Sequence, residues 1–124
     1  MPDDIRSHKD LDVWRVSRAL TTACYRATAT FPKEEIFGLT SQIRRAAVSV
    51  TANISEGYGR ETTPMFIQFL RISQGSMKEL ETLVLVSQDV ELLTAGKAEE
   101  LIAECDRVGK MLRNLIRALE RKKS

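Results

Sequence analysis

The last third of the chain spaces its apolar residues so that only an α-helix can gather them on one face. With successive residues turned by about 100°, seven of them fall within one arc: Leu101, Cys105, Val108, Leu112, Leu115, Ile116 and Leu119. A series of basic residues lies on the opposite side, and we call it the basic ridge: Arg107, Lys110, Arg113, Arg117 and Arg121. This pattern predicts an amphipathic helix with one buried stripe.

Clusters of Pro, Gly and Thr interrupt the helical periodicity near residues 30–35, 59–64 and 92–97. They leave four segments that we predict to be helices, at about 10–30, 37–58, 63–93 and 97–122. Short connections make sequential helices antiparallel neighbours. The sequence therefore predicts an all-α fold, an antiparallel up-down-up-down four-helix bundle, formed by a single domain over residues 1–124.

Two of these segments carry more apolar surface than one bundle core needs. In the first segment, Leu11, Trp14 and Tyr25 point nearly away from the inward stripe. In the third, the surplus residues extend around the helix beside the stripe: Ile72, Leu83, Val86 and Val90. Apolar and aromatic residues on an outer face are typical of an interface, so we expect the chain to form a homo-oligomer. The alternative is that Trp14 only covers an end of the bundle or the connection at residues 30–35.

The composition argues against several classes of protein. We expect a cytoplasmic protein without a membrane partner, because no apolar run approaches the roughly 18 residues of a membrane span and residues 1–10 lack a targeting pattern. Cys24 and Cys105 sit among apolar residues, which favours free core thiols over a disulfide. With His8 as the single histidine, a zinc site has no ligand set, and we expect no metal and no cofactor.

The stretch SVTANISEGYGR, residues 49–60, holds polar groups that could suggest catalysis. At helical spacing it extends a polar line along the edge of the second apolar stripe: Gln42, Arg45, Ser49, Asn53, Glu56 and Arg60. We interpret this line as a structural seam between two helices, because such groups satisfy one another there. Gly57 would permit a close helix approach, and Gly59 would end the helix in a left-handed conformation. A phosphate loop needs glycines that open a helix, whereas these glycines close one. No histidine lies among the helical segments to serve as a general base, so we predict no enzymatic site.

The segments FPKEEIFGLTSQIRRAAVSVTANISEGYGR and FIQFLRISQGSMKELETLVLVSQDVELL resemble a bacterial four-helix bundle family. The family is named after the intervening sequences of 23S ribosomal RNA genes, or S23. The resemblance implies a homopentamer, and the accessory protein of diversity-generating retroelements is similar in fold and assembly. Ser55 stands where the family more often has Ala. The most recognisable family positions are matched here by Gln42, Arg44, Arg45, Asn53, Glu56, Gly57 and Arg60.

Two functions from different classes remain open. Arg44 and Arg45, together with the basic ridge, could bind RNA or DNA backbone when repeated around an oligomer, without strong sequence specificity. Against this, residues 78–106 hold two bases and eight acids, a net charge of −6, and the ridge could simply be a solvated face. The alternative is a protein-interaction scaffold that presents aromatic and acidic surfaces to another protein and has no nucleic-acid ligand.

Overall fold

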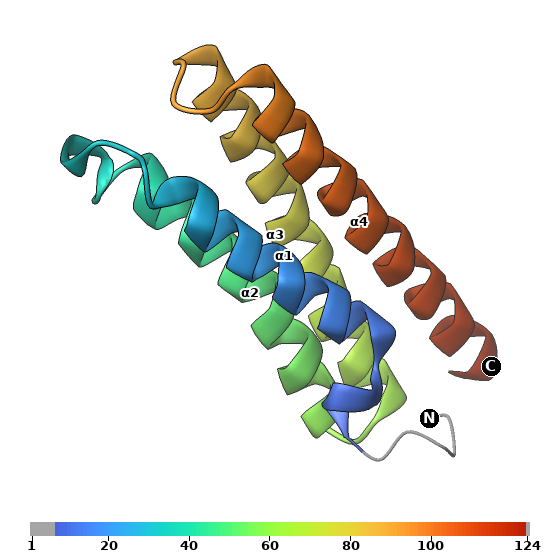
Figure 1. Cartoon of the computed structure of the whole chain (residues 1–124). Helices are drawn as coiled ribbons and strands as arrows, with labels where there is room; N and C mark the ends of the chain where they lie inside the picture. Colours follow the sequence, from blue (N-terminus) through green and yellow to red (C-terminus); the bar gives the residue numbers. More distant parts are fainter. Residues whose placement is uncertain (1–6, 124) are drawn as a thin grey trace.

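A computed structural model describes residues 7–123 of the chain. Four long α-helices and two short 3-10 helices follow one another along the chain: η1 His8–Asp10, α1 Asp12–Thr28, η2 Lys33–Glu35, α2 Leu39–Gly59, α3 Thr63–Asp89 and α4 Ala95–Lys123. Sequential helices run antiparallel and pack into an elongated bundle (Figure 1). The predicted all-α four-helix bundle is confirmed.

Side chains next to the helix ends explain where three of the helices begin. The Glu35 carboxylate accepts a hydrogen bond from the Leu39 backbone N–H at 3.0 Å, so α2 begins at Leu39 and not at the predicted residue 37. Thr62 accepts from Met65 N–H at 3.4 Å before α3, and Thr94 accepts from Lys97 N–H at 3.1 Å before α4. Each bond satisfies a backbone donor that the first helical turn leaves free.

The left-handed residue after α2 is Glu61, with φ 64°, and not Gly59 as the sequence suggested. Gly59 still has helical geometry as the last residue of α2. Glu91 after α3 also has φ 64°. There, Glu91 N–H donates to Gln88 O at 3.0 Å and Leu92 N–H to Ser87 O at 2.8 Å, the paired bonds of a Schellman motif. Both reversals therefore place a glutamate where glycine is the usual residue.

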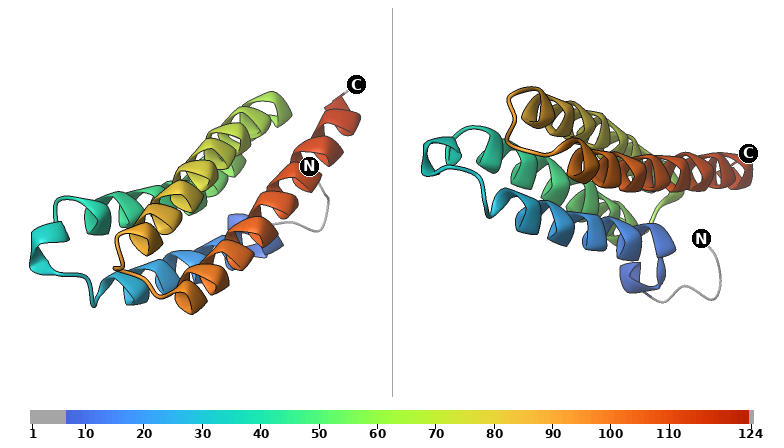
Figure 2. Two further views of the ribbon diagram at one scale, coloured as in Figure 1. Left: turned by 90° about the horizontal axis from the view of Figure 1, so that it is seen from above. Right: turned by 45° about the horizontal axis from the view of Figure 1, so that its top comes forward.

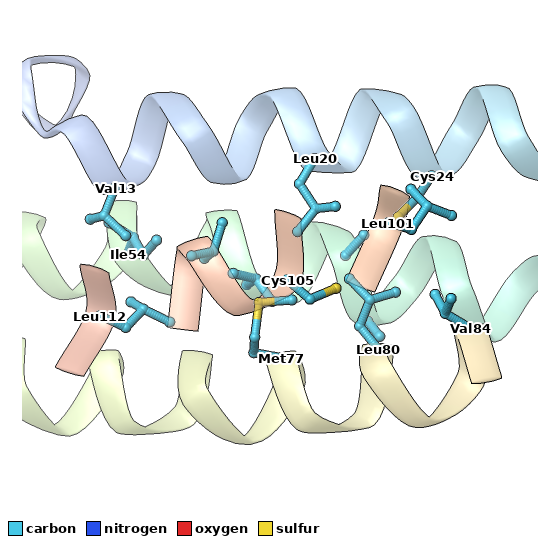
Figure 3. Packing of buried hydrophobic residues seen from close by; sticks show 14 of the residues in the cluster. Val13, Leu20, Cys24, Ile54, Met77, Leu80, Val84, Leu101, Cys105 and Leu112 are labelled. Carbon is cyan, nitrogen blue, oxygen red and sulfur yellow. The ribbon is translucent and has the colours of Figure 1, made fainter. Parts of the chain in front are cut away.

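All four helices contribute to one hydrophobic core. Figure 3 shows Cys24 of α1, Met77 and Leu80 of α3 and Cys105 of α4 pointing into the shared interior, and Ile54 of α2 further along it, beside Val13 of α1. Each large aliphatic side chain buried in this way stabilises the fold by about 1.5–3 kcal/mol. Both cysteines are free and buried, as predicted. Burial raises the pKa of each thiol to about 12.

Leu11 belongs to this core and not to an outer face, which corrects the sequence interpretation. It precedes α1 and is only 4% exposed. Its N–H donates to His8 O at 3.1 Å, so the η1 turn folds the chain back and directs Leu11 inward. Helical projection missed this because Leu11 is not itself helical. Among the described residues, no helix has the length and apolar character needed to cross a membrane.

Candidate nucleic-acid interface

The polar line of α2 lies against α3. Ser49 Oγ is 2.8 Å from Ser76 Oγ on α3, and Asn53 Nδ2 donates to Ser49 O at 2.8 Å and to Ser49 Oγ at 3.0 Å. At one end, Gln42 and Arg45 line a surface pocket with Glu79 of α3. These side chains satisfy one another at the boundary of two helices, which is the arrangement of a structural seam.

At the end of the seam, α2 and α3 come close together at Gly57. A Cβ added to Gly57 would lie 2.6 Å from the Phe69 Cβ and 3.3 Å from the Phe66 carbonyl oxygen. Glu56 and Arg60 form an exposed ion pair at 2.9 Å, and the Arg60 guanidinium lies 5.1 Å from the centre of the Phe69 ring. The absence of a side chain at Gly57 therefore lets α3 approach α2 closely.

A second group of hydroxyls, between α1 and α2, was not identified from the sequence. Thr21 Oγ1 lies 3.1 Å from both Ala47 O and Thr51 Oγ1, and Thr51 Oγ1 donates to Ser17 Oγ at 3.0 Å. Ser17 is buried. Ser17 and Thr21 are four residues apart beside the apolar stripe of α1. That spacing could have predicted from the sequence that their hydroxyls lie on one side of the helix. These hydroxyls bond to helix backbone and to each other, so their role is also structural.

Arg44 and Arg45 are adjacent in sequence but have different environments. Arg44 Nε donates to Thr28 Oγ1 at 2.9 Å, and its NH2 group donates to Tyr25 O at 3.2 Å. The Arg44 guanidinium also lies over the Tyr25 ring at 4.6 Å. The Arg44 side chain thus links α2 to the end of α1. Arg45 is exposed and forms one hydrogen bond, to Ser41 Oγ at 3.2 Å. We leave Arg44 out of the candidate interface because these contacts use two of its five N–H donors and hold its guanidinium against α1.

The basic ridge runs along the solvent side of α4, as its spacing predicted, and all five of its residues are exposed. Arg107 lies 4.0 Å from Glu104. Within residues 7–123, Lys110, Arg113 and Arg117 form no ion pair. Cations without a carboxylate partner keep their charge available to an external anion, which makes these three residues the centre of the candidate interface.

Beside the ridge, a groove of about 460 Å³ lies between α3 and α4. Its walls are formed by these residues: Arg71, Gln74, Gly75, Met77, Lys78, Glu81, Gly109 and Arg113. Gly75 and Gly109 have open space where a side chain would begin. Arg71 pairs with Glu120 at 3.1 Å and Lys78 with Glu81 at 3.4 Å, so Arg113 is the unpaired cation of the groove. Sequence analysis missed Arg71 and Lys78 because their place depends on how α3 packs on α4.

Antiparallel packing separates the charges along the bundle. The basic ridge follows α4 from Arg107 toward the C-terminal end, while the acids of residues 78–106 extend from the middle of the bundle to the opposite end, where α3 turns into α4 (Figure 2). The two groups meet in the middle, where Glu104 lies 4.0 Å from Arg107 and Glu81 shares the groove with Arg113. We call the acidic group the acidic corner: Glu79, Glu81, Asp89, Glu91, Glu99, Glu100, Glu104 and Asp106. A small net charge of +2 thus hides two oppositely charged regions.

The apolar residues assigned to an oligomer interface differ in exposure. Tyr25, Ile72, Val86 and Val90 are exposed, whereas Leu83 is half-buried against the core. Trp14 is also half-buried, with its ring 5.0 Å from the His8 ring and 5.5 Å from the Arg18 guanidinium. Four further exposed apolar residues were not singled out from the sequence: Ile36, Phe37, Val48 and Leu85. Phe37, at 94% exposed, is the extreme case.

The described residues define a four-helix bundle protein with polar seams inside and separate basic, acidic and apolar faces outside. Within them, no three His, Cys, Asp or Glu side chains are grouped so that they could hold a metal ion. The chain belongs to the 23S rRNA-intervening sequence protein family, whose model matches residues 9–114. This agrees with the resemblance seen in the motifs of α2 and α3.

A solved structure is similar in fold. It is the crystal structure of a protein of unknown function from the S23 ribosomal protein family of Bacteroides thetaiotaomicron, with a TM-score of 0.78. The sequences are 22% identical, and the likeness covers 85% of this chain and 95% of that one. Among curated proteins, no relative matches the chain.

Proposed function

We propose that this protein is a non-enzymatic homo-oligomer that binds RNA or DNA through phosphate contacts, without strong sequence specificity. One observation carries the proposal: Lys110, Arg113 and Arg117 project from one exposed face of α4 without carboxylate partners, and Arg113 also borders the groove against α3. Phosphate oxygens are the anions that such regularly spaced cations bind in nucleic acids. The subunit number of five follows from the family resemblance alone.

Assembly matters because one subunit offers few contacts. Three phosphates neutralised per subunit give a slope of about −2.7 for log affinity against log salt on duplex DNA, for each subunit engaged. Several subunits bound to one strand multiply this dependence and raise the overall affinity. The exposed apolar side chains of Ile72, Val86 and Val90 support such assembly, because contact between subunits would remove apolar surface from water.

The test is a binding titration of fluorescent mixed-sequence RNA and DNA across a series of salt concentrations, with the protein mass followed by light scattering. The variant Lys110→Glu/Arg113→Glu/Arg117→Glu should lose binding while it keeps the wild-type mass and helical content. Its binding to different sequences should fall uniformly, because phosphate contacts carry no sequence information.

A control with the same change in charge uses Lys9, Arg15 and Arg18 of the first turns, each replaced by Glu. These residues are exposed but lie outside α4, so this variant should retain most of the binding. Equal loss in both variants would show only a response to net charge and would contradict the assigned interface. A wild-type oligomer that binds neither RNA nor DNA at low salt would refute the proposal and leave the protein-interaction scaffold as the better explanation.

A further inference from the structure

The groove between α3 and α4, which run side by side (Figure 1), has a positive lining. Arg71, Lys78 and Arg113 supply three cations and Glu81 one carboxylate, a net charge of +2. Arg71 and Lys78 are exposed, and their ion pairs with Glu120 and Glu81 lie at the surface, where such pairs contribute little to stability. An anion from outside can therefore replace these carboxylates.

The groove also offers apolar surface and open space. The buried Met77 is part of its lining. At Gly75 on α3 and Gly109 on α4, no atom lies within 4 Å of the position where a side chain would begin. The groove volume of about 460 Å³ falls in the range of about 300–1,000 Å³ that is usual for ligand pockets. A flat ring can therefore enter beside a bound anion.

Gln74 adds a group that can recognise such a ring. Its side chain lines the groove and forms no hydrogen bond within residues 7–123. Its amide offers both N–H donors and a carbonyl acceptor, which suits the mixed donors and acceptors on the edge of a nucleobase. The guanidinium planes of Arg71 and Arg113 can stack on the face of a base. An acidic peptide would use the cations alone, whereas a nucleotide would use the cations, the amide and the open space.

Arg113 belongs to both the groove and the basic ridge. Lys110 lies three residues before it on α4 and Arg117 four residues after it, or about 4.5 Å and about 6 Å along the helix axis. Phosphates bound by these residues would bring an adjoining base to the groove. In a duplex that base is paired and stacked, and it could enter only if it were flipped out. The arrangement therefore favours a single strand.

We propose that the α3/α4 groove accepts an unpaired base of single-stranded RNA or DNA while Lys110, Arg113 and Arg117 bind the flanking phosphates. This inference rests on the nucleic-acid binding of the proposed function and names the form of nucleic acid that the site takes. One subunit supplies all of these residues, so the site does not depend on assembly. Stacking tolerates different sequences because every base has a flat face.

The first test compares three fluorescent DNA probes on the wild-type protein at low salt. They are a mixed-sequence single strand, an abasic single strand with the same number of phosphates, and the mixed-sequence strand annealed to its complement. The mixed-sequence strand should bind about tenfold more tightly than the abasic strand, a factor typical of one stacked base. It should also bind more tightly than the duplex, although phosphate contacts alone would favour the duplex for its higher charge density.

The second test fills the groove without changing its charge. Gly75→Leu and Gly109→Leu should both fold, as checked by circular dichroism, because each Cβ position is open and Leu is favoured over Gly in a helix. Each variant should bind the mixed-sequence strand about as weakly as the wild type binds the abasic strand, with unchanged affinity for the duplex. The matched control is Gly96→Leu, also at an open position of α4 but outside the groove. It should bind all three probes as the wild type does.

The outcomes separate this inference from the proposed function. If the wild type binds the mixed-sequence and abasic strands equally, or the duplex as tightly as the single strand, it binds phosphates only, and base insertion is refuted while the proposed function stands. Groove-filled variants that still discriminate between the mixed-sequence and abasic strands would also refute this site. A wild type that binds none of the three probes would refute the proposed function and the inference together.

Discussion

Replacing Gly57 by Ala tests whether close contact between α2 and α3 sets the geometry of the bundle. The new Cβ would lie 2.6 Å from the Phe69 Cβ, 3.1 Å from Phe66 Cδ1 and 3.3 Å from the Phe66 carbonyl oxygen. Carbon atoms in contact normally stand about 3.5–4.0 Å apart. Since the nearest atom is a Cβ and another belongs to the backbone, rotation of a side chain cannot relieve the overlap, and α3 must shift.

Two opposing terms set the size of the effect. Ala is favoured over Gly inside a helix by about 0.8–1.0 kcal/mol. Inserting an extra carbon into a well-packed core destabilises by about 1–3 kcal/mol. Gly57→Ala should therefore lower the free energy of unfolding by up to about 2 kcal/mol. Gly109→Ala, which has open space around its Cβ within α4, should instead raise it by about 0.5–1 kcal/mol.

The assay is urea unfolding followed by circular dichroism, with both variants and the wild type at one protein concentration because assembly shifts apparent stability. The difference between the two variants isolates the overlap, and it should be about 1–3 kcal/mol. If Gly57→Ala proves as stable as Gly109→Ala, the α2–α3 contact tolerates a methyl group and the reasoning from Gly57 is wrong.

Two further predictions concern the helix reversals and the buried thiols. Glu61→Gly and Glu91→Gly should each raise the free energy of unfolding by about 0.5–1 kcal/mol, because they remove a left-handed backbone strain of about 1–2 kcal/mol and add a smaller loss of conformational entropy. As a control, Glu99→Gly, inside α4, should lower the free energy of unfolding. The opposite order in urea unfolding would contradict the φ values of Glu61 and Glu91. Burial raises the pKa of Cys24 and Cys105 to about 12 from 9.0, so only the unfolded chain loses these protons between those values, and stability should fall as pH rises from 9.0 toward 12. Replacing both cysteines by Ala should reduce this loss of stability with pH, as measured by urea unfolding at several pH values. If the variant loses stability with pH as steeply as the wild type, the thiols are not the cause.

Helical periodicity was enough to place four helices because each inward stripe repeats over several turns. It failed where the chain leaves regular geometry. Leu11 precedes α1 in a turn, so projection on a helix gave it the wrong side. Gly59 was expected to be left-handed because glycine adopts that conformation most easily, yet α2 continues through it and Glu61 takes the positive φ. The preference of Gly59 for a left-handed conformation therefore did not decide where α2 ends.

The candidate interface was only partly predictable. The exposed spacing of Lys110, Arg113 and Arg117 followed from one helix alone, but their lack of carboxylate partners depends on where the acids of other helices fall. Arg44 resembled its neighbour Arg45 in sequence, and only the packing of α1 showed that its donors bond to Thr28 and Tyr25. The exposure of Phe37 was not predicted, because the second helix was expected to begin at residue 37, whereas α2 begins at Leu39 and leaves Phe37 in the turn before it.

The separation of charge along the bundle has a practical consequence for handling the protein. A molecule with cations toward one tip and anions toward the other carries a large electric dipole despite its small overall charge. Such a molecule should bind both cation-exchange and anion-exchange resins near neutral pH, orienting a different tip toward each. Its isoelectric point would therefore be a poor guide to its chromatographic behaviour.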